Sequence, residues 1–327
     1  MKMSPSAQLT GIYPRSEELI ELTREFDRGR ADEARTRKLI EAETLQVIGL
    51  QQKLRFEYLA DGALYWQDPL RPLPRTLRGV SSGARYSRWF DTNTFYLKPV
   101  ITGPVSLGEF QPSDFVRSDL TRDHAKWKVT LPGPYTFSEL SENKQGLSKD
   151  QLILEVANAE KELIQALVRS QVSLVQLSEP CLVYRPYRED NANSREIQTA
   201  LDAIRVIAEH SPIKVAVQTY FGDASPILSR LFNLPLESVG FDLYATDYEK
   251  LHLKSPRPMV LGIVDSRESH VEDPKWIAHT ATLVSKHIEA PDVVFSPNSD
   301  LKYLPRTVAD AKVEALSTAT RIYKETD

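Results

Sequence analysis

From residue 126 to the end of the chain, short apolar segments alternate regularly with longer amphipathic segments. The apolar segments are typical of β-strands and cover residues 126–137, 172–180, 213–223, 238–246, 258–269 and 292–301. The segments between them are typical of helices and cover residues 148–171, 194–211, 225–235, 247–254, 273–290 and 307–326. Strands that are apolar throughout are covered on both faces and pair in parallel. The alternation therefore predicts an α/β fold built around a parallel sheet.

The region before this alternation is charged and has helical periodicity over residues 16–59. Ser16, followed by two glutamates, is typical of a helix start, because its hydroxyl can accept from free backbone amides. Counting this region, the chain has room for eight strand–helix units. We expect one (β/α)8 TIM barrel over residues 1–327, with residues 1–60 as a helical N-terminal extension packed on it. The alternative is a doubly wound open sheet. No Gly-x-Gly-x-x-Gly opens a helix, so a dinucleotide site has no support.

Charge and hydropathy argue against several classes of protein. There are 41 basic and 45 acidic residues, which gives 41 − 45 = −4, and a nucleic-acid partner would need a basic patch or stripe. No run of about 18 apolar residues could span a membrane, and the first residues lack the apolar stretch of a signal peptide. A single cysteine fits a reducing compartment. We therefore expect a cytoplasmic protein without a nucleic-acid or membrane partner.

Polar side chains follow the apolar segments, at the place where a parallel α/β barrel keeps its functional residues. They are Asp61, Arg88, Asp91, Asn93, Thr136, Glu179, Thr219, Tyr220, Asp242, Asp265, Arg267, Asn298 and Ser299. Polar residues also end strands simply because strands meet water there. We expect a pocket at this edge, with Glu179 and Asp242 as catalytic candidates. The other candidates for substrate binding are Asp61, Arg88, Trp89, Asp91, Asn93, Tyr220, Asp265, Arg267 and Asn298.

Glu179 and Cys181 stand at the end of one expected strand, in "VQLSEPCLV". The proline after Glu179 restrains the backbone, so this carboxylate could be held to bind an ammonium group or to act as a base. Cys181 has no histidine near it in sequence, and a reactive thiolate needs a base or a positive charge. We interpret Cys181 as a buried, small apolar residue. The six histidines show no metal-ligand spacing, so no metal site is expected.

Residues 87–99, "SRWFDTNTFYLKP", are the densest aromatic and polar stretch. Arg88 and Trp89 could hold an anionic, planar ligand, because arginine pairs with carboxylates and aromatic rings stack on other rings. The alternative is a segment that packs its aromatic residues inward over the barrel. The residues alone do not decide between these two interpretations.

Several motifs together resemble those of the cobalamin-independent methionine synthases. The stretch "RWFDTNTFYLKP" is similar to the family's Lys-Trp-Phe-Asp-Thr-Asn-Tyr-His-Tyr, and "VQLSEPCLV" to its Gln-Ile-Asp-Glu-Pro-Ala-Leu. Further similar segments are "TGIYPRSEELIEL", "LADGALYWQDPL", "ITGPVSL", "LPGPYTF", "TYFGD", "LPLESVGFDL" and "LGIVDSRESHVED". The resemblance covers nearly the whole chain. Members of this family transfer a methyl group from methyltetrahydrofolate polyglutamate to homocysteine, using two related barrels. The C-terminal barrel is catalytic and binds zinc.

The chain departs from the zinc-binding barrel of this family. The family's His-x-Cys pair reads Val217-Gln218-Thr219, its last cysteine reads Ser299, and Asp242 stands near its glutamate. The resemblance is therefore to the N-terminal barrel, which lacks zinc, and we expect no metal bound by this chain. The resemblance also implies that Arg88 replaces a lysine that contacts the glutamate tail of folate. A second tail lysine is lost at Ile20, while Arg15 remains. Glu179 matches a glutamate that helps to bind the amino acid in the catalytic barrel.

Three functions remain open. The chain could be the N-terminal-type component of a split methionine synthase in methionine biosynthesis, with a separate zinc-bearing catalytic barrel as its partner and methyltetrahydrofolate polyglutamate as its ligand. It could be a stand-alone methyltransferase with a changed mechanism or donor. It could also bind folate without turnover. The first is favoured, because the zinc ligands are missing from this sequence.

Overall fold

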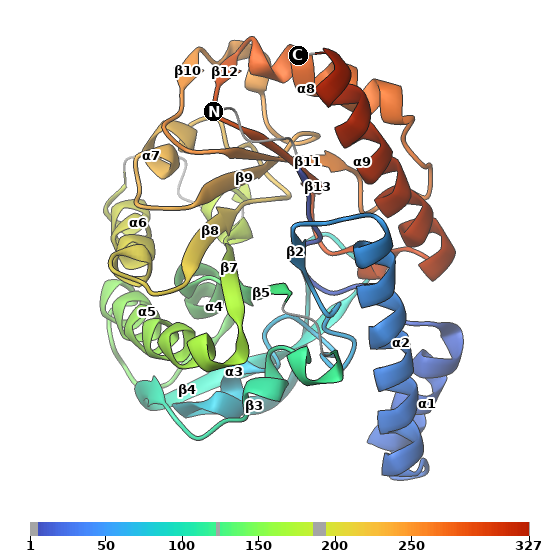
Figure 1. The fold of residues 1–327 in the computed structure, drawn as a ribbon. Coiled ribbons are helices and arrows are strands. Elements are labelled where there is room, and N and C mark those ends of the chain that lie inside the picture. The colour runs from blue at the N-terminus through green and yellow to red at the C-terminus, as the bar shows by residue number, and fades with distance from the viewer. Residues whose placement is uncertain (1–5, 122–124, 186–193, 327) are drawn as a thin grey trace.

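A computed structural model describes residues 6–121, 125–185 and 194–326 of the chain. The strands are β1 Ser6–Ala7, β2 Tyr58–Leu59, β3 Leu77–Arg88, β4 Phe95–Leu107, β5 Lys126–Pro132, β6 Glu142–Asn143, β7 Val172–Ser178, β8 Lys214–Gln218, β9 Ser238–Asp242, β10 Leu253–Lys254, β11 Met259–Val264, β12 Ile288–Glu289 and β13 Val293–Pro297. The helices are α1 Glu17–Asp27, α2 Glu33–Lys53, α3 Leu73–Thr76, α4 Pro134–Leu140, α5 Lys149–Ala166, α6 Arg195–Ala208, α7 Leu228–Phe232, α8 Pro274–Ser285 and α9 Arg306–Thr326. Strands and helices alternate from β5 onward, as the sequence predicts (Figure 1).

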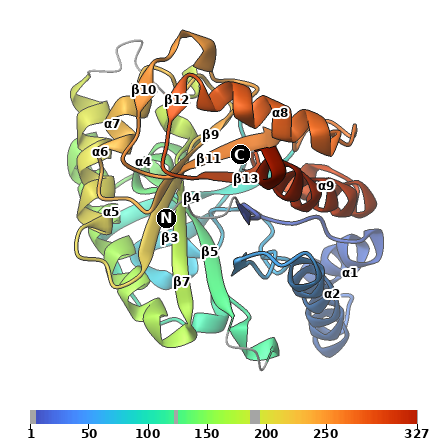
Figure 2. The same cartoon turned by 45° about the horizontal axis from the view of Figure 1, so that its top comes forward.

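The main sheet has eight parallel strands in the order β1-β13-β11-β9-β8-β7-β5-β2. It curls far enough that the Lys128 ammonium on β5 donates to the carbonyl of Leu9, which follows β1 near the opposite edge, at 2.7 Å. Figures 1 and 2 show helices α5 and α6 on one side of this sheet and α8 and α9 on another. The predicted α/β class with a parallel sheet is confirmed.

The structure differs from the sequence prediction at the two edge strands. Within the described ranges, β1 and β2 form no ladder with each other, so the expected closed barrel is seen as a curled, open sheet. One backbone hydrogen bond, from Tyr13 to Gly62 at 2.9 Å, joins the segments that follow these strands. The physical reason is length, since each edge strand contributes only two residues. Residues 1–60 therefore include two strands of the sheet, with α1 and α2 as the connection between them.

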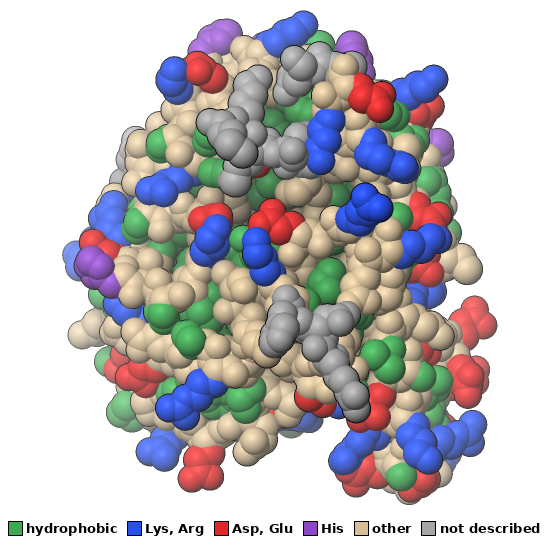
Figure 3. Space-filling model, viewed as in Figure 1, with side chains coloured by type: hydrophobic (Ala, Val, Ile, Leu, Met, Phe, Trp, Pro, Cys, Tyr) green, Lys and Arg blue, Asp and Glu red, His purple; other side chains and the backbone are tan. Residues whose placement is uncertain are grey.

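Helices α1 and α2 form a hairpin that projects from the molecule (Figures 1 and 2). Ser16 caps α1 as predicted, because its hydroxyl accepts from the amide of Leu19 at 3.1 Å. Asp32 caps α2 in the same way. Figure 3 shows acidic and basic side chains mixed over this projecting hairpin, which explains its charged sequence.

A second, smaller sheet joins β3, β4 and β6. Strands β3 and β4 pair antiparallel as a long hairpin whose tip is formed by residues 89–94. The sequence prediction placed no hairpin here. The strand alternation is broken by two register shifts, and most of β3 is exposed, so no apolar periodicity marks it. Residues 247–254, expected as a short helix, form only a single turn followed by β10.

The core is one continuous cluster of buried apolar residues that extends from Ala7 to Tyr323. Strands β9 and β11 are buried at every position, which agrees with the continuous apolar sequence of β11 and with the apolar centre of β9 between Ser238 and Asp242. On β5, by contrast, apolar residues alternate with Lys128 and Thr130, which contact the segment after β1. The inside of the curled sheet therefore holds a polar layer, and the apolar residues of β5 pack on its other face.

Candidate functional site at the carboxyl ends of the strands

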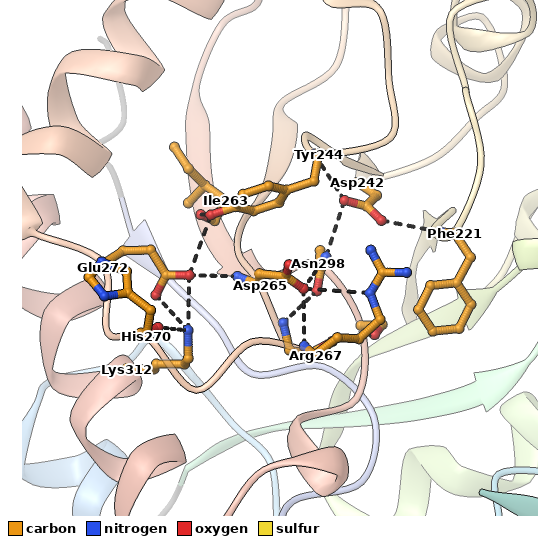
Figure 4. Close-up of polar contacts among 12 residues, drawn as sticks. Phe221, Asp242, Tyr244, Ile263, Asp265, Arg267, His270, Glu272, Asn298 and Lys312 are labelled. Atoms are coloured by element: carbon orange, nitrogen blue, oxygen red, sulfur yellow. Dashed lines mark hydrogen bonds and ion pairs between the residues drawn. The ribbon is translucent and has the colours of Figure 1, made fainter. Parts of the chain in front are cut away.

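Asp242, Asp265 and Asn298 meet at the carboxyl ends of β9, β11 and β13 (Figure 4). The Asn298 side-chain amide donates to one oxygen of Asp242 at 3.2 Å and to one of Asp265 at 3.3 Å. Its carbonyl oxygen accepts from the amide of Ser266 at 2.9 Å. The structure therefore brings together three residues that the sequence analysis nominated, and it fixes the orientation of the amide between two carboxylates.

The carboxylate of Asp242 is fully buried, and backbone amides hold it in place. It accepts from Phe221 at 3.2 Å and from Tyr244 at 3.0 Å. Burial raises the pKa of Asp242, although these hydrogen bonds oppose the rise. Strand β11, next to β9, lies very close to the segment that follows β13, since a Cβ on Gly262 would lie 2.7 Å from the Cα of Asn298. The glycine is therefore required for Asn298 to reach its position.

Arg267 is the partly exposed cation of this cluster, with 42% of its side chain accessible. Its backbone amide donates to Asp265 at 3.0 Å, and its Nε lies 3.6 Å from the same carboxylate. The guanidinium also lies 5.2 Å from the centre of the Phe221 ring, a cation–π distance. Arg267 therefore offers a positive charge at the rim that an anionic group could reach.

A buried ion pair between Glu272 and Lys312 supports the cluster from behind, and the sequence analysis missed it. The Lys312 ammonium lies 2.9 and 2.8 Å from the two oxygens of Glu272 and also donates to the carbonyl of His270. Glu272 in turn accepts from the amide of Asp265 at 2.8 Å. The sequence feature that could have indicated this ion pair is Lys312, a lysine on the apolar face of the helix expected at residues 307–326. The pair ties the loop after β11 to α9.

Glu179 has a structural role in this structure. Its carboxylate accepts from the amides of Tyr135 and Thr136 at 3.0 and 2.8 Å and from the Thr136 hydroxyl at 2.6 Å, and so it caps α4. A Cβ on residue 133 would lie 2.3 Å from an oxygen of this carboxylate. Only glycine at this position therefore leaves room for the Glu179 side chain. Burial raises the pKa of Glu179 to about 7. Glu179 lies at the end of β7, as expected, and both of its carboxylate oxygens accept hydrogen bonds from other residues of the chain.

Asp61 and Arg15 lie apart from the cluster. Asp61 is buried and accepts from the Tyr65 hydroxyl at 2.9 Å and from the Arg117 amide at 2.8 Å, which joins two loops. Arg15 lies 3.4 Å from the Thr23 hydroxyl and lines a cleft of about 560 Å³ between α1, α2 and the loops around residues 64–75 and 113–119. Asp61 thus follows the carboxyl end of β2, as expected, and no contact seen in the described residues joins it or Arg15 to the Asn298 cluster.

The tip of the β3–β4 hairpin combines an exposed polar edge with buried aromatic rings. Arg88, Asp91 and Asn93 are exposed, and Arg88 donates to Asn93 at 3.1 Å. Trp89 and Phe90 are buried, with ring centres 4.9 Å apart, and Phe90 lies 5.6 Å from Phe221. The aromatic residues therefore pack inward, as the second interpretation expects, while Arg88 and Asp91 face outward and ligand binding by this stretch stays a prediction.

Tyr220 and Trp89 line a small cavity near this tip, together with Asp300 and Thr130. Its volume is about 10 Å³, which is room for roughly one water molecule. Cys181 is fully buried, and burial raises the pKa of its thiol, in agreement with a small packing residue. The pocket expected at this edge stays a prediction, and the polar cluster around Asn298 and Arg267 marks where the nominated residues meet.

The residues at the strand ends do not fit a zinc ion. At the positions of the family's zinc ligands, Val217 is apolar, the Thr219 hydroxyl donates to the carbonyl of Gly240 at 3.4 Å, and Ser299 shares a hydrogen bond of 2.6 Å with Ser266. Across the ranges that the structure describes, no three side chains of His, Cys, Asp or Glu are grouped to hold a metal.

In the described part of the chain, no helix combines the length and the hydropathy needed to span a bilayer.

Two kinds of relative resemble this chain over most of its length. Methionine synthases of the archaea Sulfurisphaera tokodaii and Sulfolobus acidocaldarius are 22% and 23% identical over 318 residues, and each match covers 96% of this chain and 91% of the relative. A B12-independent methionine synthase of Shewanella sp. W3-18-1, solved with selenomethionine, has a TM-score of 0.73 at 17% identity, over 91% of both chains. A Listeria monocytogenes protein assigned as a vitamin-B12-independent methionine synthase has a TM-score of 0.75 at 17% identity, over 98% of this chain and 99% of its own.

At such low identity the solved structures establish the fold alone. The family model described as the N-terminal domain of cobalamin-independent synthase matches residues 75–289, which is more than half of the chain. This range contains the hairpin tip, Glu179, Asp242 and Arg267, whose geometry is given above. The chain belongs to the family of cobalamin-independent synthase N-terminal domains.

Proposed function

We propose that this chain is a zinc-free component of cobalamin-independent methionine synthesis in the cytoplasm, folded as a single domain and acting beside a separate zinc-bearing catalytic chain. The observation that carries this proposal is the chemistry of the strand ends. Where the family's zinc-binding barrel has a histidine and two cysteines, this chain has Val217, Thr219 and Ser299, and the two hydroxyls form hydrogen bonds within the protein. The match to an N-terminal domain supports the same role.

In this proposal the chain binds and orients the methyl donor, methyltetrahydrofolate polyglutamate. Arg88 is exposed at the hairpin tip, where its guanidinium can pair with a carboxylate of the glutamate tail. Arg267 supplies a second cation at the rim, held by Asp265 and Phe221. Zinc in the partner would hold homocysteine as a thiolate. The residues of this chain would position the donor next to it and exclude water.

A stand-alone methyltransferase is the second candidate, and one comparison favours it. The archaeal relatives named methionine synthase match over 91% of their own length, so chains of about this size carry that name. Such an enzyme would have to activate a thiol without the missing ligands. Asp242 is the candidate base, because burial raises its pKa and Asn298 holds its carboxylate. A folate-binding protein without turnover is the third candidate.

Sedimentation velocity tests whether a partner exists. The chain is mixed with the zinc-bearing synthase barrel of the same organism, with and without methyltetrahydrofolate triglutamate. The proposal predicts a complex of one copy of each chain that the donor strengthens. Two independent boundaries at tens of micromolar, under both conditions, would contradict the split-enzyme role and leave the stand-alone and binding functions.

A further inference from the structure

A cavity of about 350 Å³ lies at the amino edge of the main sheet, on the edge opposite the Asn298 cluster. Ser6, which begins β1, and Glu57, which directly precedes β2, form part of its wall. The end of α2 and the last turns of α9 form the rest, and Ser317 of α9 donates to the carbonyl of Leu54 at 3.3 Å. Its volume is within the range of small-ligand sites.

The charges around this cavity are mainly positive. Arg55, Arg321 and Lys324 line it, and none of them forms an ion pair with a carboxylate of the described residues. Arg321 donates only to the hydroxyl of Thr318, at 3.3 Å. Glu57 is the carboxylate of the wall, and it lies 3.0 Å from the ammonium of Lys126. Asp292 lies nearby, and the charge of Lys324 opposes the rise that burial causes in the pKa of this carboxyl. The three cations are exposed, and an anion bound in the cavity that they line would interact favourably with them.

Arg55 occupies an unusual backbone conformation for its residue type. Its φ is +60°, in the left-handed region. Its amide donates to Gln52 and the amide of Phe56 donates to Gln51, both at 3.0 Å, a pattern that ends a helix and normally uses glycine. A side chain at this position costs stability relative to glycine. The chain therefore keeps an arginine where folding alone would favour glycine, and this arginine lines the cationic cavity.

We propose that this cavity binds a small phosphate-bearing molecule. Arginine donates two parallel hydrogen bonds to a phosphate, and lysine adds a compact positive charge, which is the combination present here. The site is separate from the strand-end cluster. It holds whether the chain acts alone or with a partner.

Calorimetric titration of the full chain with pyrophosphate, inorganic phosphate and citrate tests this proposal. Pyrophosphate binds most tightly, because it places more charge between the three cations. Arg55→Gly and Lys324→Gln each weaken pyrophosphate binding about tenfold, the scale of one charge-assisted hydrogen bond. Arg55→Gly also leaves the Tm unchanged or raises it, since glycine relieves the left-handed strain. Loss of affinity therefore does not reflect unfolding.

Arg78→Gln is the matched control, because Arg78 is an exposed arginine on β3 with no ion pair to a described carboxylate. It leaves pyrophosphate affinity unchanged. Three results would overturn the proposal: no heat at millimolar pyrophosphate, equal losses in the control and the two cavity variants, or unchanged affinity in both cavity variants. Tighter binding of citrate than of pyrophosphate would overturn the assignment to phosphate.

Discussion

Arg88 carries the most direct residue-scale prediction for ligand binding. Because it is exposed and pairs only with the neutral Asn93 among the contacts seen here, it can exchange that hydrogen bond for a folate carboxylate. We expect Arg88→Ala to weaken binding of methyltetrahydrofolate triglutamate by about 1–3 kcal/mol. Calorimetry with the triglutamate and the monoglutamate measures this. An equal loss for both ligands would show that Arg88 does not contact the tail.

Lys128 carries a residue-scale prediction for stability. It is buried, with one hydrogen bond to Leu9, and burial lowers its pKa to about 7. Between pH 7 and the usual lysine pKa of about 10.5, the unfolded chain binds more protons, so stability rises with pH over this window. Lys128→Met should therefore stabilise the fold at pH 6–7, by about 3 kcal/mol after the lost hydrogen bond, and by much less at pH 10.

Urea denaturation at pH 6, 8 and 10 measures this trend. Lys38→Met on the exposed surface of α2 is the control and should show no such trend. A gain from Lys128→Met that is the same at all three pH values would mean that the ammonium is not the source of the penalty.

At the scale of elements, the Glu272–Lys312 pair joins the loop after β11 to α9. Removing one partner leaves a buried charge, so Lys312→Met should cost about 3–5 kcal/mol of unfolding free energy. The double variant Lys312→Met, Glu272→Leu should cost less than the single variant, because no unpaired charge remains. The exposed pair Lys53–Glu314, which joins the end of α2 to α9, serves as a comparison, and Lys53→Met should cost less than about 1 kcal/mol. A double variant as unstable as the single one would show that packing, and not charge, dominates.

The close approach of β11 to Asn298 gives a second element-scale prediction. A methyl group at residue 262 would lie 2.7 Å from the backbone of residue 298, so Gly262→Ala must displace the segment after β13. We expect a loss of about 1–3 kcal/mol and weaker ligand binding at the rim. Gly49→Ala, on an open face of α2, is the control and should be neutral or stabilising. Equal effects at both positions would contradict the close approach.

The sequence predicts the elements that have strong periodicity and fails where elements are short or exposed. The sequence predicts those strands between β5 and β13 that are apolar on both faces, because burial leaves a run of apolar residues. It also predicts the capped helices, because each cap needs a particular residue type at the helix start. The two-residue strands β1 and β2 leave none, and β3 is too exposed to show alternation. At the site, Asp242, Asp265 and Asn298 were predictable from their strand ends. The helix-capping role of Glu179 was not, because it depends on Gly133, which is distant in sequence.

For the whole molecule, we propose that this chain binds the methyl donor and leaves thiol activation to a partner. Among the described residues, those at the strand ends do not fit zinc, and the chain belongs to the family of N-terminal domains. The most direct test is a methyl-transfer assay with homocysteine and methyltetrahydrofolate triglutamate, run on the pure chain and then with the zinc-bearing barrel of the same organism. We predict no turnover by the chain alone and turnover by the mixture that exceeds the barrel's own. Turnover by the pure chain alone would contradict the split-enzyme role and establish a stand-alone methyltransferase.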